Sequence, residues 1–418
     1  MDYPAEVFDQ IQLLYDTNGF NDHELHCVLK FEHEPDAEIL RKSVVASIEA
    51  ISILGTRYVA GAKPHWTSLD PADFGRAVVI ARTEIEFQAF TVSRVDESVG
   101  PQIRVCLLDS GPFAVALKLN HMVCDAAGFK SYLYFLSKIY SEMRNDPSHR
   151  PTAIVGDRSM RAVLKHFTPG VKFKSLFLQR RDNNRSGDHR FPMSEGGEAQ
   201  PFILTRKLGP ERVAALKYYC RDKGATLNDA VLTAFYRGLF HALELRPRDE
   251  LQIPLMVDMR RYLGETGEPR PLTNLSSMVM TQLDYRPEEP FECALGRVKA
   301  VMDAKKGADI GLNAFIKLDL LYRILGDRTA NRLLRSQLKQ PLICMTNVGV
   351  LDPARISFGD LRPYDAFMCG SIKYKPYFQL AISSYADELT LSVNLSGDPS
   401  DRDRILSFFG TVEAELPN

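Results

Sequence analysis

The chain has 418 residues, of which 45% are hydrophobic and 25% are charged, a composition typical of a globular protein. The length exceeds what one hydrophobic core usually serves, so two domains are expected. The formal net charge of −1 gives the chain as a whole no attraction to nucleic acid or to an anionic membrane, and the sequence contains no nucleic-acid-binding motif.

Targeting and metal-binding signals are absent from the sequence. The N-terminal stretch MDYPAEVFDQ is acidic, so we expect no signal peptide, and no apolar stretch approaches the length of a transmembrane segment. The seven cysteines form no CxxC pair and the nine histidines show no metal-ligand spacing, so neither a disulfide framework nor a metal site is expected. We interpret the cysteines as buried thiols in a reducing cytosol and expect a cytoplasmic monomer.

Strand-like and helix-like patterns follow each other in the first half of the chain. Residues 23–31 predict a strand, and residues 36–51 have the three- and four-residue apolar spacing of a helix. From Phe129 onward the apolar spacing is helical again. Four further segments are predicted as strands, at residues 51–59, 87–95, 102–110 and 113–121.

Residues 178–200 are polar and without periodicity, which predicts a linker between an N-terminal domain at 1–177 and a C-terminal domain at 201–418. In the C-terminal part, Thr226 is a predicted helix N-cap, and Asn228 and Asp229 are interpreted as residues of the helix start. Strands are predicted at 202–208, 251–259, 275–285, 343–351, 378–385 and 388–395, and helices at 211–223, 224–243, about 290–305, 316–339 and 401–416. Because strands and helices occur in blocks, the fold class is α+β.

One stretch, KLNHMVCDAAGFKSYL at 118–133, suggests chemistry. His121 lies at the end of a predicted strand, and Asp125 lies in the turn that starts a helix. Taken alone, this pattern favours a structural histidine beside a capped helix. The small residues around it, however, would let a substrate approach an imidazole whose backbone is fixed, as a general base requires. Arg260 and Arg261, directly after a predicted strand, would each be able to pair with Asp125 and fix the turn.

Four segments in order resemble one superfamily. NHMVCDAAG resembles the HHxxxDG motif of the chloramphenicol acetyltransferase-like superfamily, which includes condensation domains, polyketide-associated acyltransferases, wax ester synthases and plant HxxxD acyltransferases. ATLNDAVLTAFYRGLF, PLMVDMRRYL and TNVGVLD are similar to its later helix, its arginine segment and its Asn-x-Gly strand end. The resemblance covers nearly the whole chain.

The resemblance implies an architecture and a reaction. It implies two similar domains, each a mixed sheet flanked by helices, that form a V-shaped cleft with a tunnel. The protein would transfer an acyl group from acyl-CoA, or from a phosphopantetheine-linked acyl group, to a hydroxyl or amine of a small-molecule acceptor. His121 would be the general base that takes the proton from the acceptor. No bound cofactor, no metal and no acyl-enzyme are implied, so Cys124 is interpreted as a buried thiol.

The resemblance also assigns roles to residues around the histidine. Asp125 with Arg260, or with Arg261 as the alternative, would be the structural ion pair of the site. The residues expected to bind substrate are Asn120, Gly128, Asn347 and Gly349. The motif departs from the family at Asn120, where the first histidine is expected, and at Ala126, where the glycine is expected, with Gly128 two residues later.

Two alternative functions follow from the same residues. The first is a standalone condensation enzyme whose donor is loaded on an acyl-carrier protein that acts in trans. The second is a catalytically silent protein that keeps the tunnel as a ligand site. Turnover of a thioester, and its loss when His121 is replaced, distinguishes the second alternative from an enzyme.

Overall fold

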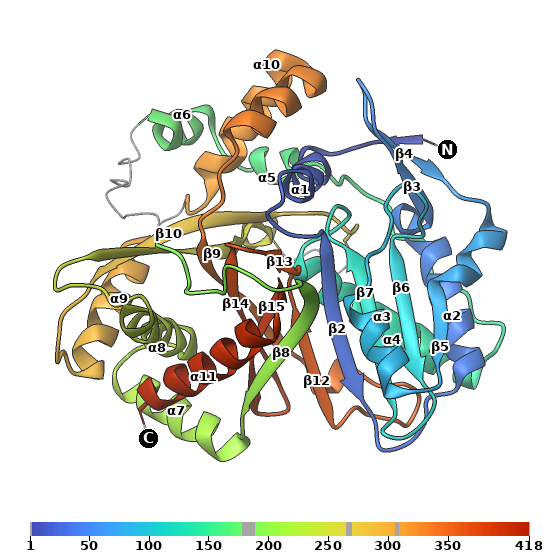
Figure 1. The fold of residues 1–418 in the computed structure, drawn as a ribbon. Helices are drawn as coiled ribbons and strands as arrows, with labels where there is room; N and C mark the ends of the chain where they lie inside the picture. The colour runs from blue at the N-terminus through green and yellow to red at the C-terminus, as the bar shows by residue number, and fades with distance from the viewer. Residues whose placement is uncertain (1, 178–188, 265–269, 306–308, 418) are drawn as a thin grey trace.

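The computed structural model describes residues 2–177, 189–264, 270–305 and 309–417. Two large sheets carry helices on their faces, and a small sheet lies near the N-terminus (Figure 1). The predicted α+β class is confirmed. Within these described ranges, no helix is long and apolar enough to cross a bilayer, and no group of three His, Cys, Asp or Glu side chains has the arrangement of a metal site.

The first large sheet has the strand order β12-β2-β7-β6-β5. Its strands are β2 (Glu24–Lys30), β5 (Val78–Ala81), β6 (Ile103–Leu108), β7 (Ala114–Asn120) and β12 (Asp365–Cys369). All neighbours are antiparallel except β5 and β6. Since β12 comes from the second half of the chain, the two halves share this sheet. The predicted domain boundaries at 177 and 201 remain a prediction.

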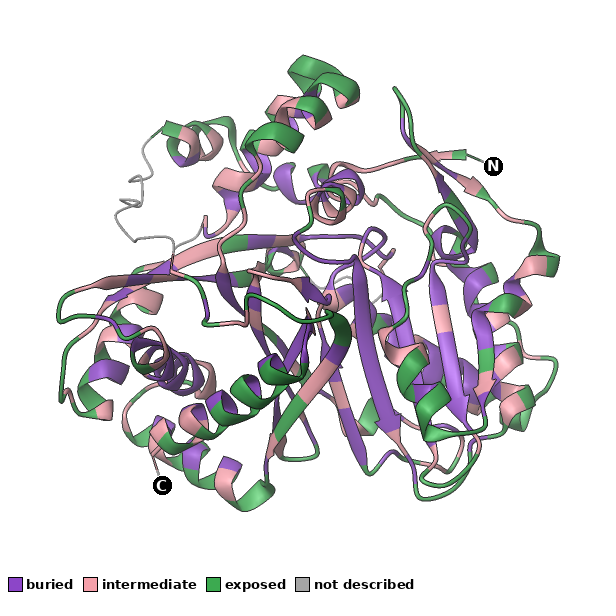
Figure 2. Cartoon of the chain, in the orientation of Figure 1, coloured by how far each residue is buried: buried purple, intermediate pink, exposed green. Residues whose placement is uncertain are grey.

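Both faces of the first sheet are covered. Leu25, Cys27 and Leu29 of β2 pack into the larger core together with α2 (Ala37–Ala50) and α4 (Ala126–Asn145). Val28, on the opposite face, packs with Phe87 of α3 (Glu84–Val92). Successive residues of a strand point to opposite faces of the sheet, so these contacts show that both faces of β2 are covered. Figure 2 shows β2 and β7 buried along almost their whole length.

The second large sheet has the strand order β10-β9-β11-β14-β15-β13, and β8 also pairs with β15. Its strands are β8 (Gln200–Leu208), β9 (Glu250–Asp258), β10 (Ser276–Asp284), β11 (Ile343–Leu351), β13 (Lys373–Tyr374), β14 (Phe378–Tyr385) and β15 (Glu388–Gly397). Its helices are α7 (Pro210–Asp222), α8 (Leu227–Ala242), α9 (Phe291–Lys305) and α11 (Pro399–Glu415). Phe191 stacks on Phe378 at a ring-centroid distance of 4.0 Å, so the segment before β8 helps to fill this core.

The remaining elements lie above the two large sheets in Figure 1. The small sheet has the order β1-β4-β3 and consists of β1 (Asp2–Pro4), β3 (Thr56–Val59) and β4 (His65–Ser68). The helices of this region are α1 (Val7–Thr17), α5 (Arg161–Leu164), α6 (Pro169–Phe177) and α10 (Leu312–Gln337). Short 3-10 turns occupy Ser52–Gly55, Pro71–Ala77, Met259–Tyr262 and Pro353–Arg355. α10 is kinked at Gly326, whose φ of 69° lies outside the helical region.

Most predicted elements are found, but several expectations were wrong. Residues 87–95 were predicted as a strand and fold largely as helix α3, because Thr83 caps its N-terminus and accepts the Glu86 amide at 3.2 Å. Residues 52–55 form a 3-10 turn before β3. Cys293 is exposed, whereas the other six cysteines are buried. Of the predicted linker, residues 178–188 lie outside the described residues, and β8 begins at Gln200.

A buried ion pair ties α1 to the small sheet and to the segment before α5. Asp9 accepts the Trp66 indole N–H at 2.8 Å and two N–H groups of Arg158 at 3.1 and 3.0 Å. Replacing Asp9 with alanine leaves the Trp66 indole without its acceptor and the Arg158 guanidinium without its carboxylate, so we predict a free energy of unfolding lower by about 3–5 kcal/mol. Denaturant unfolding measures the change. Glu34→Ala, at an exposed position, is the control and should stay within about 0.5 kcal/mol of wild type; an equally small change in Asp9→Ala would contradict the account.

Candidate active site

His121 directly follows β7 and precedes the capped start of α4. Its backbone N–H donates to the carbonyl oxygen of His23 at 2.6 Å, which holds it against the beginning of β2. The four residues that follow, Met122 to Asp125, are buried, whereas His121 itself keeps part of its surface exposed. The local structure is therefore as predicted, a histidine at a strand end that is not fully buried.

Asn274 determines which ring nitrogen of His121 carries the proton. The Asn274 side-chain nitrogen donates to the carbonyl oxygens of His121 and Met122, at 2.8 and 3.0 Å. Its Oδ1 therefore faces His121 Nδ1, at 3.1 Å. Because an amide oxygen only accepts hydrogen bonds, Nδ1 must be the protonated nitrogen, and the lone pair of the neutral ring is on Nε2.

Asp125 both caps helix α4 and binds the turn after β7 to segments of the second half of the chain. Its Oδ1 accepts the Gly128 amide at 2.9 Å, which caps α4. Its Oδ2 accepts Arg260 Nη1 at 2.9 Å, the Leu275 amide at 2.7 Å and the Ser276 hydroxyl at 3.1 Å. One carboxylate thus joins the turn after β7 to the segments around β9 and β10.

Arg260 belongs to the short helical turn after β9, and the Thr273 carbonyl fixes it further. Its Nη2 donates to that carbonyl at 2.7 Å, and its Nη1 also lies 3.1 Å from Asp258 Oδ1. The structure therefore pairs Asp125 with Arg260. Arg261, the alternative partner, instead lies over the Tyr262 ring at 5.8 Å.

Burial shifts the pKa values of both His121 and Asp125, and only at Asp125 do neighbouring charges and hydrogen bonds reverse the shift. Burial lowers the pKa of His121 below its usual value, and the Lys373 ammonium adds to the shift, so the ring is neutral near pH 7. Burial alone would raise the pKa of Asp125, but Arg260 and the Gly128 and Leu275 amides outweigh it and hold that pKa below its usual value. The site thus combines a neutral imidazole with an ionised carboxylate.

Two residues expected to bind substrate lie inside the protein framework. Asn120 is fully buried; its amide donates to Gln102 Oε1 at 2.7 Å and its Oδ1 accepts the Met122 amide at 2.8 Å. A side chain at Gly128 would come within 2.9 Å of Cys124 Cβ and 3.5 Å of Arg260 Nη2. In this structure Asn120 shapes the turn, and Gly128 makes room for the Asp125–Arg260 ion pair. That either residue contacts substrate stays a prediction.

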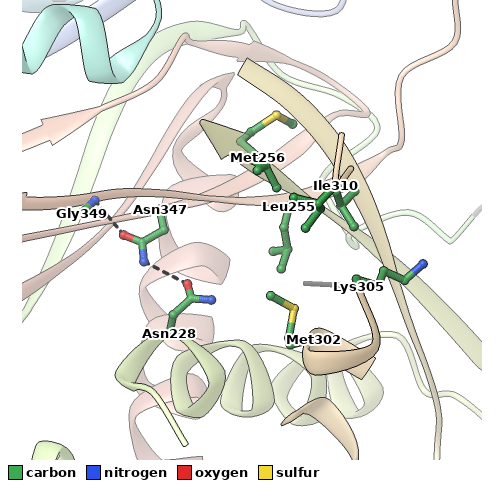
Figure 3. A pocket seen from close by; sticks show the side chains of 10 residues that line it. Asn228, Leu255, Met256, Met302, Lys305, Ile310, Asn347 and Gly349 are labelled. Carbon is green, nitrogen blue, oxygen red and sulfur yellow. Dashed lines mark hydrogen bonds between the residues drawn. The ribbon is translucent and has the colours of Figure 1, made fainter. Parts of the chain in front are cut away.

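The other two, Asn347 and Gly349, line a pocket of about 280 Å³ between β9, β10, β11, α8 and α9 (Figure 3). Asn347 donates to Asn228 Oδ1 at 3.0 Å and accepts the Gly349 amide at 2.8 Å. The rest of the lining consists of Leu255, Met256, Val257, Val279, Met302, Lys305 and Ile310. A mainly apolar wall with an amide pair at one side suits a chain that carries both methylene and amide groups.

The pocket and the histidine turn share supporting elements. Leu255 to Val257 of β9 line the pocket, and the same strand leads to Arg260. From α4, Lys130 Nζ donates to the Val348 carbonyl at 3.1 Å, between the two β11 residues of the pocket. The residues that the sequence singled out therefore form two neighbouring groups, one around His121 and one around Asn347.

Sequence reasoning missed Asn274 and Asn228. Asn228 was interpreted only as a helix-start residue, and it does lie in the first turn of α8, after the Thr226 cap. Asn274 stands just before a predicted strand, in PLTNLSSM, where nothing in the local pattern relates it to a histidine 153 residues away. The only signal in the sequence was the polar Thr273–Asn274 pair directly before a predicted strand.

Comparison with known proteins gives structural matches only. No protein-family model matches the chain, and no curated protein matches its sequence. Polyketide synthase associated protein 5 from Mycobacterium tuberculosis superposes with a TM-score of 0.70 at 16% identity, over 100% of this chain and 99% of that one. TRI3 trichothecene 15-O-acetyltransferase from Fusarium sporotrichioides superposes with a TM-score of 0.72 at 12% identity, over 100% and 95%. The first condensation domain of the CDA synthetase has a TM-score of 0.65 at 15% identity, over 100% and 95%.

These matches span the whole chain and define the class of its fold. The chain shares its fold with polyketide synthase associated protein 5, an O-acetyltransferase and a condensation domain, and this confirms the fold that the resemblance implied. At these identities the likeness concerns the fold, and the chemistry has to be argued from the site.

Arg260 and Arg261 offer a matched pair of substitutions. Arg260→Ala leaves the Asp125 carboxylate buried without its cation, so we predict a free energy of unfolding lower by about 3–5 kcal/mol near neutral pH. Arg261→Ala removes an adjacent, exposed arginine that lies over the Tyr262 ring and should change stability by less than about 0.5 kcal/mol. Denaturant unfolding of the two variants measures the difference. Equal effects on stability would show that the Asp125–Arg260 ion pair does not hold the turn after β7.

Proposed function

We propose that the protein is an acyltransferase that moves an acyl group from a thioester to a hydroxyl or amine acceptor, with His121 as general base. The observation that carries the proposal is the hydrogen bond between His121 Nδ1–H and Asn274 in a histidine that is only partly buried, because this leaves Nε2 free to accept a proton. The structural neighbours include an O-acetyltransferase and a condensation domain, which agrees with this class of reaction.

The chemistry follows from the tautomer. Nε2 takes the proton of the acceptor as its oxygen or nitrogen attacks the thioester carbonyl carbon. The tetrahedral oxyanion collapses, the carbon–sulfur bond breaks, and the departing thiolate takes the proton back from Nε2. Asn274 Oδ1 stabilises the imidazolium formed in between through the Nδ1–H bond. No covalent enzyme intermediate is needed, and burial raises the pKa of Cys124 well above its usual value, which keeps that thiol protonated.

The pocket around Asn347 supports a place for the donor. A pantetheine arm or acyl chain presents apolar segments and amides, which match Leu255, Met256 and Ile310 on one side and the Asn228–Asn347 pair on the other. The donor would be acyl-CoA or an acyl group on a carrier protein acting in trans. Comparing thiol release from free acyl-CoA with release from the same acyl group on a carrier separates the two donors.

Replacing the base tests the proposal directly. In His121→Ala, thiol release from a competent acyl thioester should fall by about 10²–10⁴-fold, because proton removal from the acceptor is lost. His33→Ala, an exposed histidine on the same half of the chain, should keep the wild-type rate. Unchanged turnover in His121→Ala would remove the assignment of the base. Binding of thioesters with no consumption of any of them would favour a silent ligand-binding protein.

Filling the pocket should change the substrate range. Val279→Trp places a bulky ring in the cavity of about 280 Å³, so we predict that kcat/KM for long acyl donors falls at least about tenfold relative to acetyl donors. Val350→Trp, an exposed position on the same sheet, is the control. An unchanged ratio between long and short donors in Val279→Trp would place the acyl chain elsewhere.

A further inference from the structure

A buried charged cluster lies directly behind the backbone of His121. His23 has no exposed side-chain surface, and its Nε2 lies 3.1 Å from Glu97 Oε2 while its Nδ1 lies 3.6 Å from Asp16 Oδ2. Asp16 also pairs with Arg94. His23 is thus a buried imidazole between two carboxylates, which is the surrounding of a charged ring and not of a neutral one.

The same residue carries the hydrogen bond that holds the catalytic candidate. The carbonyl oxygen of His23 accepts the His121 N–H at 2.6 Å, so the side chain and the backbone of one residue link the charged cluster to the base. β2 begins at the next residue, Glu24, which pairs with Asn120 in register. A shift of His23 therefore moves the partner of His121 directly.

The segment around His23 is also fastened to the second sheet. Asn21 forms a β-bridge with Lys373 and accepts Lys373 Nζ at 2.8 Å. The Asp22 amide donates to the Ile372 carbonyl at 3.0 Å, and Asp22 Oδ1 accepts the Ile372 amide at 2.9 Å. These bonds fix the backbone just before His23, and the pairing of Glu24 with Asn120 fixes it just after, so both set where the His23 carbonyl lies.

We propose that His23 is a positioning residue: its charged ring, held between Asp16 and Glu97, fixes the carbonyl that aligns His121. This inference rests on the proposed function for its catalytic consequence, but the alignment itself is a statement about structure. The hydrogen bond that the structure gives between His23 and His121 joins backbone atoms, so His23 acts on His121 through the backbone.

The charges around His23 determine the expected pH dependence. Burial by itself lowers the pKa of His23, but the hydrogen bond to Glu97 and the charges of Glu24, Glu97 and Asp16 outweigh it, so the pKa is raised above 6.5. Burial raises the pKa of Asp22 to about 6 and also raises that of Glu24, and these two residues flank His23 in the chain.

The raised pKa of His23 determines how the stability and the activity change with pH. The stabilisation from protonated His23 is complete below pH 6.5 and is lost as the pH rises through the higher pKa of the folded state. His121, with its lowered pKa, becomes an active base on the acid side of that range. Activity should therefore rise with pH as His121 loses its proton and fall again as His23 loses its own.

The experiment compares His23→Gln and Glu97→Gln with His33→Gln as the exposed control. In His23→Gln we expect kcat to fall about tenfold to a hundredfold with little change in KM, the alkaline fall in kcat to disappear, and exchange of the His121 amide to become about tenfold faster. In Glu97→Gln the alkaline fall should move to lower pH, because a carboxylate that supports the charged ring is gone.

The outcomes separate this inference from the proposed function. A wild-type pH profile and wild-type protection of the His121 amide in both variants would overturn the positioning role. If His23→Gln does not fold, the shift in Glu97→Gln, at a residue with 21% side-chain exposure, decides the question. If no thioester is consumed by any form of the protein, the proposed function fails, and the pH dependence of His121 amide exchange in Glu97→Gln still decides whether His23 aligns it.

Discussion

The buried pair of Asp125 and Arg260 is the interaction on which the rest of the site depends. An isolated carboxylate would not stay ionised at this depth, and an isolated guanidinium would cost several kcal/mol to bury. Together, and with the Gly128 and Leu275 amides and the Ser276 hydroxyl, they satisfy one another. Because the partners come from α4, from the turn after β9 and from the start of β10, the pair sets how the two halves meet at His121.

Around the Asp125–Arg260 pair, one part of the structure positions the imidazole of His121 and another part forms the pocket. The turn after β7 presents an imidazole, and the segment 273–276 orients it: Asn274 fixes the tautomer while the Thr273 carbonyl holds Arg260. The second sheet supplies a pocket with apolar and amide lining a short way along β9. A base of defined protonation and a neighbouring pocket are the two requirements of acyl transfer between bound substrates.

The sequence predicted the local elements of the site but not its long-range contacts. The strand end at His121, the Asp125 cap and the Thr226 cap follow from residue chemistry within a few positions, so periodicity and capping rules were sufficient. The insertion of β12 beside β2 depends on tertiary pairing, and no local pattern signals it. Helix α3 was missed because its two phenylalanines and its valine favour strands by propensity, whereas the Thr83 cap decided otherwise. Asn274 and His23 were missed because their roles arise only when distant segments meet.

The proposed chemistry depends on one proton, the hydrogen on Nδ1 of His121. NMR of the protein labelled with ¹⁵N-histidine observes it directly, and His121→Gln assigns the signal among the nine histidines. We predict a neutral ring near pH 7 with a protonated Nδ1 and an unprotonated Nε2, and a pKa below 6.5. A ring protonated on Nε2, or charged at neutral pH, would contradict it.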